Sequence, residues 1–277
     1  MQEMTLREIQ TLSLEILKDI HNFCVQNDIT YTLYGGTMIG AIRHKGFIPW
    51  DDDIDIAMPR PDYERFINTY RSEKNYELVA AGMQDSYIAF SRVCEMNKTR
   101  VVNRILPWRK HDTGVWIDIF PLDAAPDNYD EAKTLITGFV KDWKECCAIR
   151  SSFSNFGDVH GMGKKIKLFA KKIIRRMPGK DINTLNRRYI EHCKAIPWGS
   201  TDHFANLAYM GYGIKEYLCM DDIKEMILVP YEDAQFYVCK GYDHLMTMKY
   251  GDYMQLPPVE QQTSNHELVK YYWTCKK

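Results

Sequence analysis

Acidic residues gather in the stretch FIPWDDDIDIAMPRPDYERF, residues 47–66, where the chain turns apolar. Its carboxylates fall within five positions: Asp51, Asp52, Asp53 and Asp55. Two carboxylates about 4 Å apart repel by about 4 kcal/mol at an effective dielectric of about 20, so a fold that holds them together calls for a cation. Hard oxygen ligands select Mg²⁺, Mn²⁺ or Ca²⁺. The stretch therefore predicts a divalent-metal site.

A strand over residues 53–58 would position these acids. Side chains alternate between the two faces of a strand, so Asp51, Asp53 and Asp55 are expected on one face and the isoleucines between them in the core. We expect Asp53 and Asp55 to ligate the metal.

The acidic stretch has two other interpretations. The acids match the 1-3-5 spacing of an EF-hand calcium loop, but Ile56 stands where that loop needs glycine for its sharp turn. Pro59 and Pro61 also interrupt it, so we reject calcium binding of that kind. The other alternative is a solvated acidic turn, because runs of charge usually lie on the surface.

A second acidic strand is expected in GVWIDIFPLD, residues 114–123. Trp116, Asp118 and Phe120 would share one of its faces, and the isoleucines between them the other. Aspartate is depleted in strands, so Asp118 between apolar neighbours is a candidate third acidic group. The alternative is a buried aspartate that is simply hydrogen-bonded.

A glycine pair lies between a strand at 30–34 and a helix at 37–44, in LYGGTMIGAI. Backbone amides at a helix N-terminus bind phosphate, and glycine lets a phosphate approach closely. We therefore expect Gly35, Gly36 and Thr37 to hold phosphate. A plain Gly-Gly turn remains the alternative.

Cationic residues follow directly in RHKGF. Arg43 and Lys45 are suited to offset phosphate charge ahead of the acids. The alternative is that both are solvated loop cations. A glycine turn onto a helix, Asp-x-Asp on a strand and one aspartate on a later strand together form the nucleotidyltransferase arrangement, in which carboxylates hold metal and metal holds a nucleotide's phosphates.

The elements that must carry these residues can be located by periodicity. Thr5 to Glu8 has the form of a capping box before an amphipathic helix at 6–27. Asp62 is expected to cap the helix after the acidic strand. Further strands are expected near 76–80, 87–95 and 114–120. Beyond residue 128 the pattern predicts mainly helices, at 129–150, 163–177, 183–195 and 241–250.

The composition of the whole chain excludes several classes. Its 277 residues are 45% hydrophobic with a net charge of −1, so no bias toward nucleic acid exists. No apolar run approaches the roughly 18 residues of a spanning helix. The N-terminus has acids and no apolar core segment, unlike a signal peptide, and a cytoplasmic protein is expected. We expect the eight cysteines to be reduced, mostly buried thiols, a structural zinc site being the alternative.

The stretch LYGGTMIGAIRHKGFIPWDDDIDIAMPRPDYERF closely resembles the signature of the LicD family, the phosphocholine transferases of bacterial surface glycans. DIFPLD (118–123) and YGDYMQLPP (250–258) resemble it too. Fukutin and fukutin-related protein, which transfer ribitol phosphate, have a similar catalytic block. The matching blocks are spread along most of the chain, whereas residues 125–225 match no pattern and are where acceptor specificity is expected.

The resemblance implies a nucleotidyltransferase-like α/β (α+β) fold with a mixed sheet, flanking helices and a mainly helical middle and C-terminal region. It also implies Mg²⁺ (or Mn²⁺), a CDP-alcohol donor and a glycan acceptor, here expected to be lipid-linked. The family's roles carry over to Gly35, Gly36, Asp53, Asp55 and Asp118, the last as metal ligand or as base. His266, after the last block, has no assigned role.

Three segments are expected: a catalytic core at 1–125, a helical acceptor region at 126–225 and a C-terminal segment at 226–277 that returns to the core. The donor that the resemblance implies is expected to be CDP-choline, whose quaternary ammonium cannot be hydrogen-bonded and is usually held over aromatic faces. Trp50 and Trp116 could reach it, and Trp108 is a further candidate. The alternative for these tryptophans is an ordinary place in the core.

Residues 163–180, GKKIKLFAKKIIRRMPGK, carry eight cations and no acid. Ile166, Phe169, Ile173 and Met177 fall at helical spacing, so this helix could lie at the inner face of an anionic membrane. The alternative is that its apolar face packs on the domain.

Two other functions are compatible with the sequence of the whole chain. One is a nucleotidyltransferase acting on a sugar phosphate or another small molecule, which would release pyrophosphate rather than CMP. The other is a noncatalytic glycan- or nucleotide-binding module, which would not need three converging carboxylates.

Overall fold

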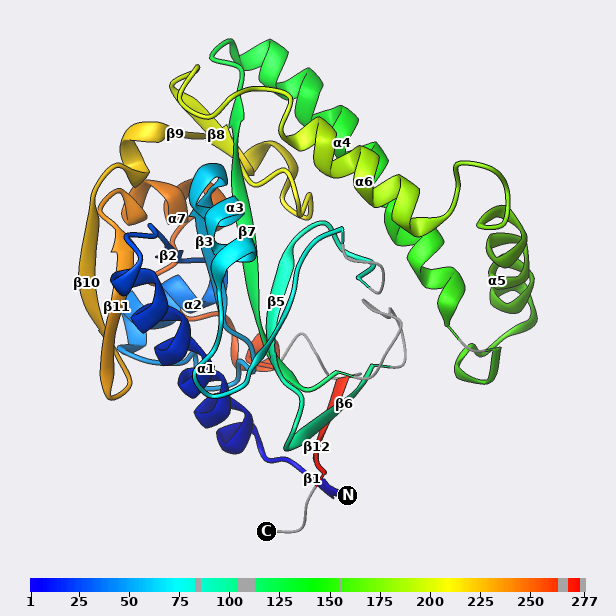
Figure 1. Cartoon of the computed structure of the whole chain (residues 1–277), viewed down its shortest axis with the longest axis horizontal. Helices are drawn as coiled ribbons and strands as arrows, with labels where there is room; N and C mark the ends of the chain where they lie inside the picture. Colours follow the sequence, from blue (N-terminus) through cyan, green and yellow to red (C-terminus); the bar gives the residue numbers. More distant parts are fainter. Residues whose placement is uncertain (83–85, 104–112, 155, 264–268, 275–277) are drawn as a thin grey trace.

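The computed structural model describes residues 1–82, 86–103, 113–154, 156–263 and 269–274. A mixed sheet forms the centre, with strand order β2-β3-β7-β5-β4 and with β8 and β9 continuing from the far end of β7 (Figure 1). The strands are β2 Thr32–Leu33, β3 Asp55–Pro59, β4 Glu77–Val79, β5 Ser91–Glu95, β7 Val115–Ala125, β8 His203–Ala205 and β9 Leu218–Cys219. The α/β class expected from the sequence is confirmed.

The central strand β7 is buried along its whole length. It runs parallel to β3 and antiparallel to β5, so polar side chains from the two neighbouring strands can meet beside it. β7 is longer than predicted because its last residues extend beyond β3 and β5 and pair with β8. Asp123, for example, lies opposite Ala205. β3 begins at Asp55, two residues later than predicted.

Two helices, α1 (Leu6–Gln26) and α3 (Arg60–Thr69), contact the central strand. The predicted capping box at the start of α1 is confirmed by reciprocal hydrogen bonds between Thr5 and Glu8. The prediction that Asp62 caps α3 is wrong, because the helix begins at Arg60 and Pro59 precedes it without a side-chain cap.

The middle of the chain forms helices close to the predicted bounds: α4 Tyr129–Arg150, α5 Met162–Ile174 and α6 Ile182–Cys193. α4 and α6 lie side by side, and α5 lies beyond their end, away from the central sheet (Figure 1). Short 3₁₀ turns connect the elements: Ser151–Phe153, Phe156–Asp158, Gly213–Glu216, Met220–Ile223 and Val259–Gln261.

The expectation of mainly helical structure beyond residue 128 needs correction in the last third. A hairpin, β10 (Met226–Tyr231) with β11 (Ala234–Cys239), precedes α7 (Tyr242–Tyr250). Its turn is Glu232-Asp233, with Glu232 at φ 57°, and it lacks the glycine that usually marks such turns. Pro230 also weakens the strand pattern.

A second, three-stranded sheet joins both ends of the described chain, in the order β1-β12-β6. Its strands are β1 Gln2–Glu3, β6 Thr99–Asn103 and β12 Val269–Trp273. The division into segments 1–125, 126–225 and 226–277 stays a prediction. No helix in the described part of the chain is both long and apolar enough to cross a membrane. The seven cysteines in that part are free thiols, four of them buried.

Candidate active site

A cavity of about 440 Å³ opens beside the start of β3 and the first half of β7, where these strands carry aspartates. The acids that line it are Asp51, Asp53, Asp55 and Asp118. The parallel pairing of the two strands sets Asp55 directly opposite Asp118, which explains how two segments about 60 residues apart contribute to one cavity. Ile54 and Ile56 are fully buried, so the predicted separation of acidic and apolar faces is confirmed.

Strand alternation explains only part of this arrangement. Asp51 and Asp53 precede β3 rather than lying on it. Their backbone is held instead by a turn, closed by the Asp51 amide on the Ile48 carbonyl at 2.9 Å. Asp52 is buried and does not line the cavity. On β7 the alternation holds, since Trp116, Asp118 and Phe120 all line the cavity.

The two glycines lie directly against these carboxylates. They are the first residues of α2 (Gly35–Ile39), which starts two residues earlier than predicted and continues as a π-helical turn, Gly40–His44. A Cβ on Gly35 would stand 2.8 Å from Asp55 Oδ2, and one on Gly36 would stand 2.8 Å from Asp51 Oδ2. Gly35 also has φ +56°, which other residues rarely adopt. Glycine is therefore needed here for the acids to approach the helix backbone.

Thr37 acts on the position of an acid. Its hydroxyl accepts a hydrogen bond from the Asp55 amide at 2.9 Å, and the side chain is buried outside the cavity lining. Arg43 and Lys45 also lie outside that lining: the Arg43 guanidinium donates to the Tyr253 carbonyl at 2.6 Å, and the Lys45 ammonium donates to the Ile42 carbonyl at 3.0 Å. The structure thus does not bring Thr37, Arg43 or Lys45 to the place where phosphate was expected.

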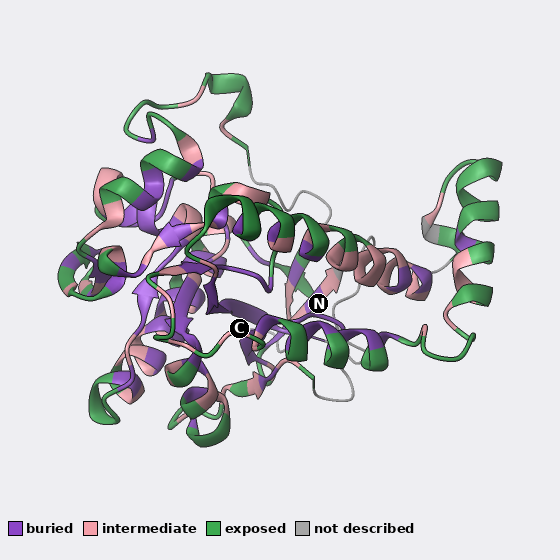
Figure 2. Cartoon of the chain, turned by 90° about the horizontal axis from the view of Figure 1, so that it is seen from above, coloured by how far each residue is buried: buried purple, intermediate pink, exposed green. Residues whose placement is uncertain are grey.

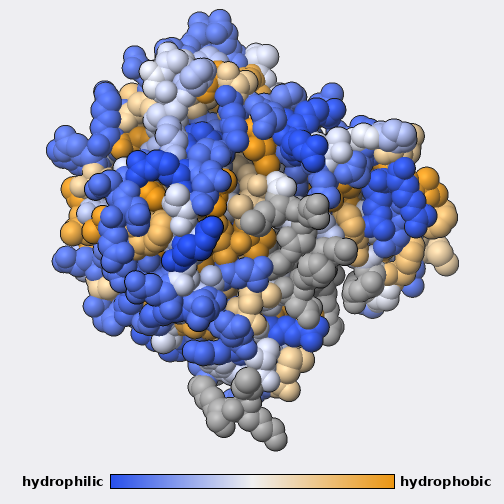
Figure 3. All heavy atoms as spheres, in the orientation of Figure 1, coloured by the Kyte–Doolittle hydropathy of each residue, from blue (hydrophilic) through white to orange (hydrophobic). Residues whose placement is uncertain are grey.

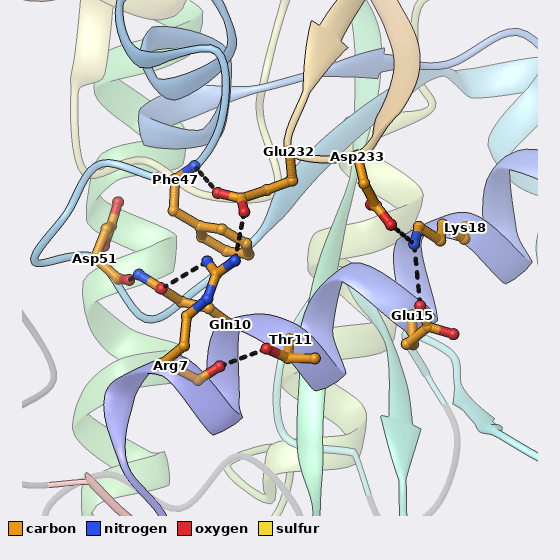
Figure 4. Close-up of polar contacts among 9 residues, drawn as sticks. All are labelled: Arg7, Gln10, Thr11, Glu15, Lys18, Phe47, Asp51, Glu232 and Asp233. Carbon is orange, nitrogen blue, oxygen red and sulfur yellow. Dashed lines mark hydrogen bonds and ion pairs between the residues drawn. The ribbon is translucent and has the colours of Figure 1, made fainter.

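The acidic loop is held from outside by α1 and the β10–β11 turn (Figure 4). The Gln10 amide donates to the Asp51 carbonyl at 2.9 Å. Glu232 accepts from the Phe47 amide at 3.2 Å and pairs with Arg7 at 2.7 Å. These contacts fix the backbone that presents the acids while leaving their carboxylates directed to the cavity.

Crowding shows in the electrostatics of Asp53. Burial raises the pKa of its carboxyl well above the usual range, and the charges of Asp55 and Asp51 raise it further. The negative charge of Asp118 is compensated by a cation. Arg92 on β5 contacts both of its carboxylate oxygens, one of them at 3.1 Å. Sequence reasoning missed Arg92, which no motif marks.

Two further cations line the cavity from distant elements. Arg150 stands at the end of α4; burial lowers the pKa of its guanidinium, with the nearby charge of Arg92 among the causes. No carboxylate of the described residues pairs with it. Lys249 on α7 pairs with Glu216 at 2.8 Å, and its ammonium lies 4.3 Å from the ring centre of Tyr34.

The predicted tryptophans Trp50 and Trp116 both line the cavity. The Arg92 guanidinium lies 4.3 Å from the Trp116 ring centre, so that ring already carries one cation. Aromatic residues not singled out from the sequence also line it: Tyr34, Phe90, Trp143, Tyr209, Tyr212 and Tyr250. The last of them belongs to the YGDYMQLPP block, which was the available signal. Trp108 and His266 lie outside the described residues.

The residues can be tested for their fit to a divalent metal. Among the described residues, no three Asp, Glu, His or Cys side chains are grouped closely enough to hold an ion by themselves. Mg²⁺, however, is usually bound by one or two carboxylates, with waters and substrate phosphates completing the octahedron. Asp53 and Asp55 fit that pattern, since their mutual repulsion would be relieved by a cation.

The sequence family described as "LicD/FKTN/FKRP, nucleotidyltransferase domain" matches residues 28–166 of this chain. The lipopolysaccharide cholinephosphotransferase LicD of Haemophilus influenzae is 32% identical over 269 residues, which cover 96% of this chain and 97% of that protein. An uncharacterized protein of Rickettsia prowazekii is 32% identical over 35% of this chain and 40% of its own length. Another, from Rickettsia typhi, is 43% identical over 21% of this chain and 19% of its own length.

Proposed function

This chain belongs to the LicD/FKTN/FKRP nucleotidyltransferase-domain family, and from that membership we propose that it transfers phosphocholine from CDP-choline to a hydroxyl of a surface-glycan precursor, releasing CMP. The similarity that supports the proposal extends over almost the whole length of a lipopolysaccharide cholinephosphotransferase. The observation that carries it is that acids, cations and aromatic rings line the same cavity of about 440 Å³.

In this proposal Asp53 and Asp55 hold Mg²⁺, or Mn²⁺ in its place. The metal would neutralise charge on the donor's diphosphate. Gly35 and Gly36 leave room for the diphosphate beside the acids as well as for the carboxylates themselves. The bare backbone there is compatible with the phosphate role expected from the sequence.

Arg150 and Lys249 take over the role first expected of Arg43 and Lys45. Both line the cavity that the acids line. A guanidinium without a described carboxylate partner is available to an anion, and arginine suits the planar, two-point recognition of phosphate oxygens. We assign Arg150 to the donor's phosphates, with Lys249, which Glu216 orients, as a second cation of the cavity.

The chemical step joins the acceptor's hydroxyl oxygen to the phosphorus of phosphocholine and breaks the bond between that phosphorus and the oxygen of CMP. The acceptor's proton must leave the hydroxyl, and Asp118 is placed to receive it. The alternative for Asp118 is a third metal ligand. Arg92 holds the carboxylate in either case, and acts as a positioning residue.

Aromatic side chains would hold the choline end. Trimethylammonium cannot donate hydrogen bonds and is stabilised over ring faces. We assign the contact with trimethylammonium to Trp50, because the Arg92 guanidinium already lies over the ring of Trp116. A cytoplasmic location at the inner face of the membrane, where a lipid-linked acceptor would be met, completes the proposal.

A thermal-shift screen of CDP-alcohols tests the donor directly, because a ligand that binds only the native state raises its melting temperature. CDP-choline with Mg²⁺ is expected to give the largest shift, and the shift should shrink when Mg²⁺ is left out. Equal or larger shifts with CDP-ribitol or CDP-glycerol would overturn the assignment of choline. Pyrophosphate rather than CMP as product would indicate the nucleotidyltransferase alternative.

A further inference from the structure

The helix α5 presents its apolar side chains to solvent. Figure 2 shows it exposed on most of its surface, at the far side of the molecule from the central sheet. Four apolar residues of α5 and one just after its end form a stripe that is between 49 and 76% exposed: Met162, Ile166, Phe169, Ile173 and Met177. The interpretation in which this apolar face packs on the domain is therefore wrong.

The opposite side of the helix is the one that contacts the body. Leu168 is its buried residue, at 5% exposed. The Lys171 ammonium donates to the Ser151 hydroxyl at 2.8 Å, and the Arg175 guanidinium lies 4.3 Å from the Phe153 ring centre. At 100° per residue, these positions fall about half a turn away from Ile166 and Ile173. The attachment of α5 therefore turns its apolar stripe outward.

Cations border this stripe. Lys165 and Arg176 fall on one side of it and Lys167 on the other, and all three are exposed. Figure 3 shows apolar side chains along the outer edge of the lobe that α5 forms, beside a band of hydrophilic ones. The segment 163–180 carries eight cations and no acid, so the rest of the chain has a net charge of −1 − 8 = −9.

We propose that this face of α5 binds the surface of an anionic lipid bilayer. A bilayer interface accepts an apolar stripe among its acyl chains and the bordering cations at its phosphates, which is the pattern of helices that lie in the interface. A nucleic acid would satisfy the cations but leave the apolar stripe in water. The same face of a second copy would bring eight like charges against eight. The inference does not rest on the identity of the donor or of the acceptor.

Co-sedimentation of the full chain with vesicles tests the proposal. Vesicles of phosphatidylcholine with phosphatidylglycerol should pellet the protein, vesicles of phosphatidylcholine alone should not, and added salt should weaken the binding. The double variant Lys165→Glu, Arg176→Glu should bind about tenfold more weakly or worse. Phe169→Ser should also weaken binding, because it removes the apolar contact but no charge.

A matched control changes two exposed lysines of α4, Lys141→Glu and Lys144→Glu, which alter the net charge equally. This control should retain most of the binding. Equal binding of native protein to neutral vesicles, no binding to anionic ones, or equal loss in the control would overturn the proposal. So would sedimentation velocity that shows self-association lost in Phe169→Ser while vesicle binding stays unchanged. None of these readouts requires turnover, so failure of the proposed reaction would leave them interpretable.

Discussion

Four aspartates in one short stretch have different roles, and their surroundings decide which. Asp52 is buried and does not line the cavity, whereas Asp53 and Asp55 line it. The charge of Asp53 is disfavoured both by burial and by the neighbouring carboxylates, which raise the pKa of its carboxyl. A side chain held in such a place costs stability unless a cation joins it.

Replacing Asp53 by asparagine should separate function from folding. Asp53→Asn removes one charge at nearly constant shape, so we expect transfer to fall by about 100-fold or more while the metal-free protein melts at a higher temperature. Activity and thermal unfolding in the presence of a chelator measure the two effects. Asp52→Asn is the matched control and should retain most activity. Near-normal turnover of Asp53→Asn would contradict the metal assignment.

Gly35→Ala tests whether a residue without a side chain is needed at position 35 for Asp55 to lie against the start of α2. The new Cβ would clash with Asp55 Oδ2, and alanine at this positive φ costs about 1–2 kcal/mol. We expect a lower free energy of unfolding in urea and loss of the Mg²⁺-dependent shift with CDP-choline. Gly138→Ala, in the middle of α4 with open space around it, should instead stabilise the protein by up to about 1 kcal/mol. If Gly35→Ala and Gly138→Ala had the same effect on stability and on the Mg²⁺-dependent shift, Gly35 would not be needed for the close approach of Asp55 to the helix backbone.

At the scale of elements, β7 carries two acids with separate tasks. Asp118 faces the cavity, while Asp123 lies five residues further on and is buried against Arg60, with the atom pairs at 2.6 and 2.7 Å. This ion pair joins the end of β7 to the start of α3. The resemblance to DIFPLD therefore covers a structural acid as well as a candidate catalytic one.

Breaking this pair should cost stability rather than chemistry. Asp123→Ala leaves the buried Arg60 with only its longer contact to Glu64, at 3.4 Å, and we expect a loss of about 3–5 kcal/mol in the free energy of unfolding. Replacing both residues, as Arg60→Met with Asp123→Leu, should restore part of it, because no charge is then left buried. Urea denaturation of the three proteins measures this. A double variant as unstable as the single one would show that the pair does not act as a unit.

The elements that could be predicted from the sequence are those with strong periodicity. α1, α4 and α6 carry regular apolar faces, and their ends agree with prediction within about two residues. The β10–β11 hairpin could not be found, since its turn has no glycine and Pro230 interrupts one strand. The cations of the cavity could not be predicted either. Arg92 and Arg150 lie far in sequence from the recognised blocks, Lys249 lies just outside one of them, and only the tertiary fold brings the three to one cavity.

At the scale of the whole molecule, the cavity is assembled from all parts of the chain. Three acids come from the first quarter of the chain, Asp118 from β7, Arg150 from the end of α4 and Lys249 from α7. The middle region, which no motif identified, thus contributes directly to the candidate site. The charge distribution is also segregated, with the basic α5 segment set against an acidic remainder.

Arg150→Met should weaken donor binding although it lies far in sequence from every recognised motif. Loss of a cation from the phosphate site is expected to raise the KM for CDP-choline about tenfold, with a smaller change in kcat. Arg187→Met, on the exposed face of α6, is the matched control and should behave as the native protein does. An unchanged KM in Arg150→Met would place the donor's phosphates elsewhere in the cavity.

The identity of the products tests the central claim most directly. The purified protein is incubated with CDP-choline, Mg²⁺ and a glycan acceptor, and nucleotide and glycan products are identified by mass spectrometry, with Asp53→Asn run in parallel. The account predicts that CMP accumulates in step with acceptor that has gained one phosphocholine, and that the variant forms neither. Pyrophosphate release with a nucleotide joined to the acceptor, or no phosphocholine on any glycan while CDP-choline still binds, would contradict it.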